Sequence, residues 1–114
     1  MKLKHHKDLT IQRWKEFPLY QRILMIATEL VRAKNWIEKE DWEEAKNCYE
    51  RALELVDLTV ATVKGNLLGE LLRWREIFGF YYYKKAYTIK ENERFYKSLI
   101  FLDKDAFNLL IKDK

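Results

Sequence analysis

Apolar residues recur at alternating steps of three and four along most of this chain, and this spacing constrains the fold more than any other feature. The first series consists of Leu19, Ile23, Ile26, Leu30, Ala33 and Ile37. The second consists of Trp42, Ala45, Tyr49, Ala52, Val56, Thr59 and Val63. The last consists of Phe95, Leu99, Leu102, Ala106 and Leu109. Such steps place side chains on one face of an α-helix, so the spacing predicts amphipathic helices.

Helix starts are marked by residues that cap or tolerate the first turn. Asp41 is followed three residues later by Glu44, which is typical of a capping box, and Thr88 with Glu91 repeats that spacing. Pro18 suits the first helical position, where its missing N–H costs nothing. These signals predict three helix starts, at about residues 18, 41 and 88.

The middle and the end of the chain offer further breaks. Gly65 is predicted to end the second long helix, and Asn66 to cap the third. Asp103 could cap a separate short helix, which leaves the continuity of residues 103–105 open. The expected helices therefore span about residues 18–39, 41–63, 66–87 and 88–111. Short connections between them predict an all-α fold, an antiparallel four-helix bundle with a basic N-terminal arm.

Length and composition indicate one domain of an intracellular protein. The 114 residues can bury a core, and we expect a mobile arm over residues 1–17 and a bundle domain over 18–114. A single Cys48, no signal-like segment and no long apolar span predict a cytoplasmic location. The usage of Lys and Glu resembles that of a thermophile. The net charge of +4 falls largely in the arm, so nucleic acid is an unfavoured partner.

No group of residues predicts catalysis. The two histidines, His5 and His6, are adjacent in the arm and lie far in sequence from Cys48, so a solvated arm explains them better than a metal site. A Gly-rich phosphate loop is also missing from the sequence. We therefore expect a protein that is not an enzyme and that has no cofactor, no metal and no catalytic residues.

An excess of aromatic residues within residues 74–87 points to a binding surface. In a helix, Leu71, Trp74, Phe78 and Tyr81 form one stripe, whereas Leu72, Phe80 and Tyr83 point well away from it. One stripe can face the core, and the remainder needs another partner. The expected partner-binding residues are Leu67, Leu71, Trp74, Phe78, Tyr81 and Tyr82. Two alternatives remain open, since the aromatic residues could simply fill the core, or could bind nucleic acid together with neighbouring Arg and Lys.

Two family resemblances rest on residues 33–55. Ala33, Trp36, Ala45, Tyr49 and Ala52 match the spacing of one tetratricopeptide hairpin. The run from Ala33 to Ala45 also resembles the first hairpin of the flagellar export chaperone FliS family, and this resemblance extends over residues 18–110, through an aromatic near Phe78. The family's Met-Leu-Tyr-Asp-Gly-Ala stretch is replaced here by the sequence of residues 24–29.

The FliS resemblance implies an export chaperone, monomeric or weakly dimeric, that captures the C-terminal segment of flagellin. Such a protein binds an aggregation-prone, partly disordered partner and performs no turnover. Two alternatives are a generic tetratricopeptide-like interaction or dimerisation module and a small nucleic-acid-binding helical bundle. Which partner is bound stays open at this stage.

Overall fold

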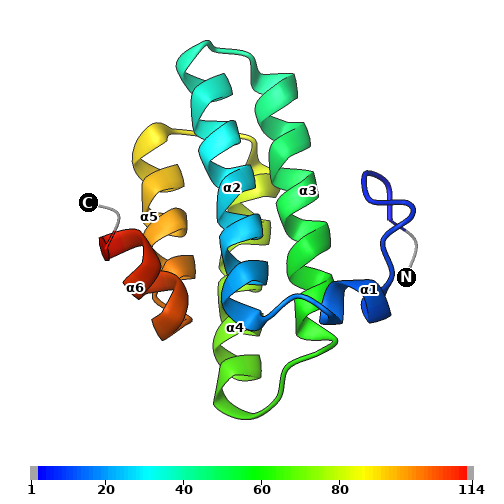
Figure 1. The fold of residues 1–114 in the computed structure, drawn as a ribbon. Coiled ribbons are helices and arrows are strands. Elements are labelled where there is room, and N and C mark those ends of the chain that lie inside the picture. Colours follow the sequence, from blue (N-terminus) through cyan, green and yellow to red (C-terminus); the bar gives the residue numbers. More distant parts are fainter. Residues whose placement is uncertain (1–2, 113–114) are drawn as a thin grey trace.

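The structure, a computed structural model, describes residues 3–112. All regular secondary structure within that range is helical, and turns connect the helices. Two of the helices are short, and four have twelve or more residues. In chain order they are α1 (Ile11–Lys15), α2 (Leu19–Glu38), α3 (Trp42–Val60), α4 (Gly65–Lys84), α5 (Ile89–Ile100) and α6 (Lys104–Lys112) (Figure 1). The all-α prediction is confirmed.

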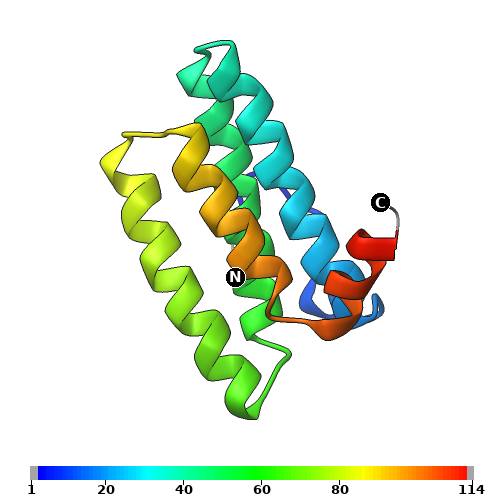
Figure 2. The ribbon, with the colours of Figure 1, turned by 90° about the vertical axis from the view of Figure 1, so that its left-hand side faces the viewer.

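Helices α2 and α3 form the centre of the fold. They lie side by side and share the most extensive contact, while α5 packs on α2 and α4 packs on α3 (Figures 1 and 2). The small side chains of Ala33, Ala45 and Ala52 are fully buried, which allows the helices to approach closely. Trp42 was expected in the same series, but its side chain is 49% exposed because it is the first residue of α3.

Two of the expected caps are present. The Asp41 side chain accepts a hydrogen bond from the backbone N–H of Glu44 at 3.2 Å, and Thr88 accepts one from Glu91 at 3.1 Å. Pro18 is the N-cap of α2 rather than its first helical residue, since its ψ of 155° is extended. The helix starts predicted at Pro18, Asp41 and Thr88 were therefore correct to within one residue.

The expected break at Gly65 and Asn66 was wrong in detail. Helix α3 already ends at Val60, because the N–H of Ala61 and the hydroxyl of Thr62 bond to carbonyls of its last turn. Gly65 instead begins α4, with φ of +65° and Lys64 as N-cap. The end of α4 was also placed too late: Lys85 adopts the left-handed conformation at φ of 58° and stops the helix.

The last predicted helix is divided into α5 and α6. The carboxylate of Asp103 accepts a hydrogen bond from the N–H of Ala106 at 3.0 Å and so caps a new helix. Phe101 and Phe107 stack beside this break with ring centroids 4.8 Å apart. The alternative of a separate short C-terminal helix is confirmed.

The expectation of a solvated arm was wrong for Trp14 and for the segment around His5 and His6; Met1 and Lys2 lie outside the described residues. Trp14 is fully buried, and its indole N–H donates to the hydroxyl of Thr59 at 2.9 Å. Backbone N–H groups of Lys4, His5 and His6 surround the Glu54 carboxylate at 3.0–3.2 Å. The arm is therefore held on α3 by the buried Trp14 side chain and by carboxylates of α3, of which Glu54 binds the backbone of the arm.

Candidate protein-docking surface on helix α4

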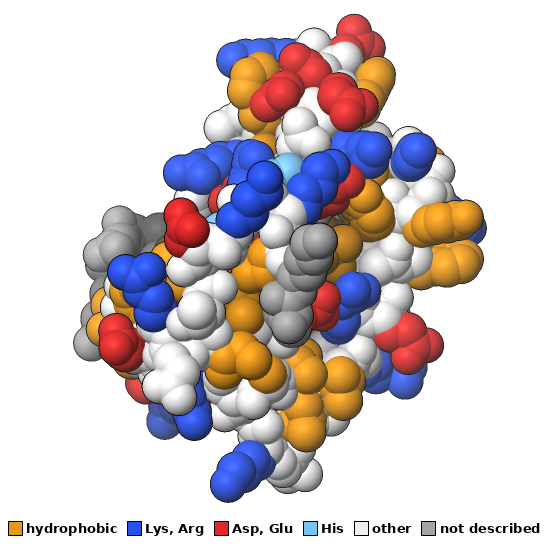
Figure 3. Space-filling model, turned by 90° about the vertical axis from the view of Figure 1, so that its right-hand side faces the viewer, with side chains coloured by type: hydrophobic (Ala, Val, Ile, Leu, Met, Phe, Trp, Pro, Cys, Tyr) orange, Lys and Arg blue, Asp and Glu red, His pale blue; other side chains and the backbone are white. Residues whose placement is uncertain are grey.

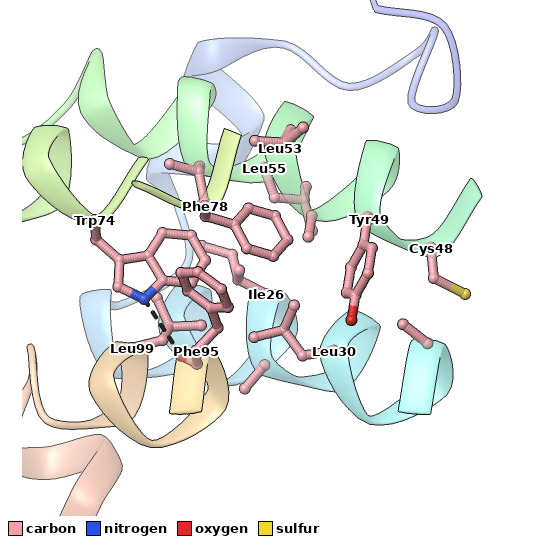
Figure 4. Close-up of a cluster of buried hydrophobic side chains, with 14 of the residues drawn as sticks. Ile26, Leu30, Cys48, Tyr49, Leu53, Leu55, Trp74, Phe78, Phe95 and Leu99 are labelled. Atoms are coloured by element: carbon pink, nitrogen blue, oxygen red, sulfur yellow. Dashed lines mark hydrogen bonds between the residues drawn. The ribbon is translucent and has the colours of Figure 1, made fainter. Parts of the chain in front are cut away.

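Helix α4 carries the aromatic excess and divides it between two faces. Its inward face holds Leu71, Trp74 and Phe78, each at most 6% exposed. The rings of Trp74 and Phe78 stack with centroids 4.8 Å apart, and the Trp74 indole N–H donates to the carbonyl of Phe95 at 3.3 Å (Figure 4). Since burial of this kind is typical of a core, these three residues hold α4 to the rest of the protein.

Tyr81 and Tyr82 are half-buried, and their hydroxyls are bonded inside the protein. The hydroxyls of Tyr81 and Tyr49 lie 3.0 Å apart, and that of Tyr49 also accepts from the Asn92 amide at 2.7 Å. Tyr82 donates to the carboxylate of Glu50. Burial raises the pKa of both Tyr81 and Tyr82, and for Tyr82 the carboxylate of Glu50 adds to the rise. Both tyrosines therefore stay neutral at neutral pH, and both hydroxyls are bonded within the protein.

The six residues expected to bind a partner are thus separated by the fold. Leu71, Trp74 and Phe78 fill the core, which was the alternative left open for them. Leu67, Tyr81 and Tyr82 lie at the edge of the core with part of each side chain exposed. A partner that docks on this conformation of the protein reaches only the second group.

The exposed apolar residues of α4 lie on its opposite side, and we call them the α4 outer face. They are Leu72, Ile77, Phe80 and Tyr83, which are 46%, 50%, 63% and 80% exposed. The Lys84 ammonium lies 4.6 Å from the centre of the Phe80 ring. Hydrophobic side chains protrude at the right-hand edge of Figure 3, on the side of the molecule where α4 lies. Such a cluster of large exposed apolar residues is typical of an interaction site.

A groove adjoins the outer face between α4 and α3. Its volume is about 650 Å³, and the residues that line it are Leu53, Arg75, Glu76, Ile77, Gly79, Phe80, Tyr82 and Tyr83. Arg75 reaches the carboxylate of Asp57 at 2.8 Å. A Cβ atom on Gly79 would lie 2.7 Å from that guanidinium, so the glycine leaves room for the ion pair. The groove is therefore lined mainly by apolar and aromatic side chains, its one arginine is paired, and Glu76 adds one carboxylate to the lining.

The N-terminal arm meets this groove through Glu50. That carboxylate accepts hydrogen bonds from Tyr82, from the ring of His5 at 2.9 Å and from Lys4 at 3.2 Å. Burial acts to raise the pKa of Glu50, but these hydrogen bonds outweigh it and lower the pKa to about 2. The pKa of Glu54 is lowered in the same way by the arm, against the effect of burial. Both carboxylates are therefore charged at neutral pH and hold the arm next to the groove.

The described residues give little support for chemistry at this surface. No three His, Cys, Asp or Glu side chains within residues 3–112 come together in a way that could hold a metal ion. Cys48 is fully buried, and burial raises the pKa of its thiol despite the nearby Arg51. A buried thiol with a raised pKa is a poor nucleophile.

Sequence reasoning separated the two faces of α4, and three of its six expected binding residues, Leu71, Trp74 and Phe78, lie on the buried face. The helical positions of Leu72, Phe80 and Tyr83 already placed them away from the inner stripe, and their exposure confirms this. Ile77 was missed, although its position lies between the two faces. Leu53, on α3, could only be added once the contact between α3 and α4 was known.

Comparisons with protein families, with curated proteins and with solved structures give no match to this chain. None of the helices within residues 3–112 combines the length and the apolar character that a bilayer crossing requires.

Proposed function

We propose that this protein is a chaperone-like binding protein that captures an amphipathic segment of a partly disordered partner. In this proposal α2, α3, α4 and α5 act as an antiparallel four-helix bundle, and the segment docks on the α4 outer face and in the adjoining groove. The protein releases its partner unchanged and performs no turnover. The cytoplasm is the proposed compartment.

The observation that carries the proposal is the exposure of Phe80 and Tyr83 beside the groove. An aromatic side chain buries about 150–250 Å² when a partner covers it, so two such residues can anchor a complex. The guanidinium of Arg75 is already neutralised by Asp57, which leaves the groove with mainly apolar contacts to offer. A segment with one apolar face fits these contacts.

The resemblance to the FliS family suggests the partner. It implies that the captured segment is the C-terminal part of a flagellin, which is disordered before assembly and contains amphipathic pieces. This partner makes the proposal testable with a defined peptide.

The test is isothermal titration of the protein against a C-terminal flagellin segment at low and at high salt. We expect saturable binding that tolerates salt, because burial of apolar surface dominates it. The double variant Phe80→Ser, Tyr83→Ser should abolish binding and leave the fold intact, since both side chains are exposed. Phe101→Ser is the matched control, because Phe101 is 66% exposed but lies after α5.

Equal binding by the double variant and the wild type would exclude the α4 outer face as the docking site. Binding that falls steeply with salt would indicate electrostatic contacts and would contradict groove capture. Absence of binding by the wild type would remove flagellin as the partner.

A second candidate is a tetratricopeptide-like interaction or dimerisation module. The large apolar side chains exposed on α4 favour it, because such residues are typical of a surface that a partner or a second copy covers.

A further inference from the structure

The solvent side of α4 carries a second series of residues at alternating steps of three and four. We call it the outer seam, and it consists of Asn66, Gly69, Arg73, Glu76, Phe80 and Tyr83. Every one of these residues is exposed. The inward contacts of α4 use Leu71, Trp74 and Phe78 instead, so the fold of one chain does not explain the seam. Within this seam the aromatic side chains of Phe80 and Tyr83 form the apolar part that a second helix would cover.

Gly69 is the one position of the seam that carries no side chain. Glycine inside a helix is unfavourable relative to alanine by about 1 kcal/mol. No atom lies within 4 Å of the position that a Cβ on Gly69 would occupy. The small size of Gly69 is therefore not required inside this chain, and it leaves a hollow between Asn66 and Arg73 on the outside.

The same helix supplies a side chain that would fill this hollow. Consider two copies of α4 that pack antiparallel, centred on a point between Arg73 and Glu76. Each seam residue of one copy then faces the residue of the other copy for which the two residue numbers add to 149. Phe80 of one copy then lies over Gly69 of the other, at both ends of the contact. Tyr83 lies over Asn66 in the next layer. The seam is thus complementary to itself in shape.

The charges of the seam select the same arrangement. In the antiparallel register Arg73 of each copy faces Glu76 of the other, which gives two opposite-charge contacts at the centre. A parallel register would place arginine against arginine and glutamate against glutamate, which is repulsive. Within residues 3–112 neither side chain takes part in a salt bridge, so both charges are free for such contacts.

We propose that two copies of this chain associate through the outer seam as an antiparallel homodimer. A two-fold contact of this kind is closed, because each copy presents the same surface. The dimer covers Phe80 and Tyr83, so it excludes the client segment of the proposed function from the α4 outer face. The second copy and the client segment compete for the same residues, and the dimer is tested on the protein alone, without a client.

The test is the oligomeric state of charge variants, measured by sedimentation equilibrium over a range of concentrations. Arg73→Glu places two glutamates in each central contact, and Glu76→Arg places two arginines there. Each single variant should raise the dissociation constant of the dimer by roughly tenfold or more. Glu38→Arg is the control, because it makes the same charge change on an exposed residue at the end of α2 and should leave the dimer unchanged.

Mixing the two single variants provides the decisive measurement. One then carries Glu at both positions and the other carries Arg at both, so an equimolar mixture should form a heterodimer as tight as the wild-type dimer. The double variant Arg73→Glu, Glu76→Arg should also dimerise, because it exchanges the two charges. A monomeric wild type, single variants that dimerise normally, or a mixture that stays monomeric would each overturn the proposal.

Discussion

Replacement of Trp14 tests whether the N-terminal residues belong to the core. The side chain is fully buried, and a tryptophan buries about 200 Å², which is worth about 5 kcal/mol at about 25 cal/mol per Å². Partial relaxation around the vacated space reduces the loss, so we expect Trp14→Ala to lower the free energy of unfolding by about 3–4 kcal/mol. A domain of this size has a total of about 5–15 kcal/mol, so the variant should still fold.

A second substitution separates the contribution of the Trp14 hydrogen bond to stability from that of its buried apolar area. Trp14→Phe keeps most of that area and loses the N–H that donates to Thr59, whose hydroxyl still donates to the carbonyl of Leu55 at 2.8 Å. We expect this variant to cost about 1–2 kcal/mol, intermediate between the wild type and Trp14→Ala. Urea unfolding followed by circular dichroism gives both values, provided that the slope with urea is unchanged.

Ile11→Ala is the matched control on the same short helix. Its side chain is 38% exposed, so its truncation should cost less than about 1 kcal/mol. If Trp14→Ala cost no more than Ile11→Ala, then α1 would not be packed on α3 in solution. The reasoning that joins the arm to the core would then be refuted.

Two further variants test the charged groups. The pKa of Glu50 in the folded protein, about 2, lies below the value of an unfolded glutamate, so its contribution to stability is present at neutral pH and is lost as pH falls from about 4.5 to 2. Glu50→Gln should therefore be less stable than the wild type at neutral pH and should lose less stability on acidification. Urea unfolding at a series of pH values measures both, and a decrease in the free energy of unfolding equal to that of the wild type would contradict this. Arg22 is 8% exposed, and its Nε has no hydrogen-bond acceptor among the described residues, although its terminal nitrogen donates to Thr62. Because burial of this charge is costly, Arg22→Met should leave the melting temperature unchanged or raise it, and a clear fall would show that the guanidinium is stabilising.

Helical class and most helix starts could be read from the chain because they depend on local chemistry. A carboxylate or hydroxyl three residues before a free N–H acts as a cap whatever surrounds it, and Asp41 and Thr88 were found in this way. The turn near Gly65 was misplaced because the carbonyls at the end of α3 are satisfied earlier, by Ala61 and Thr62. The sequence alone does not show which of these two possible end points, Ala61–Thr62 or Gly65, stops the helix.

The long-range contacts of the candidate site could not be predicted from the sequence. Glu50 and Glu54 read as ordinary surface glutamates of an amphipathic helix, and the arm reads as a solvated basic segment. The contact between His5 and Glu50 joins residues that are 45 positions apart, and no local spacing in the sequence predicts it. For α4, periodicity separated the inward residues from Phe80 and Tyr83, but only the burial of each side chain shows which of the two faces is covered.

The tight connection between α2 and α3 also has a consequence for the order of folding. These helices share the largest contact in the molecule and are joined by only three residues, 39–41, so closing this hairpin costs little chain entropy. Trp14 must instead find Thr59 across 45 residues. Contacts that are close in sequence form early, so we expect the α2–α3 hairpin to belong to the folding nucleus and α1 to dock after the rate-limiting step. Loosening Trp14 would then shorten the lifetime of the folded protein while leaving its rate of refolding nearly unchanged.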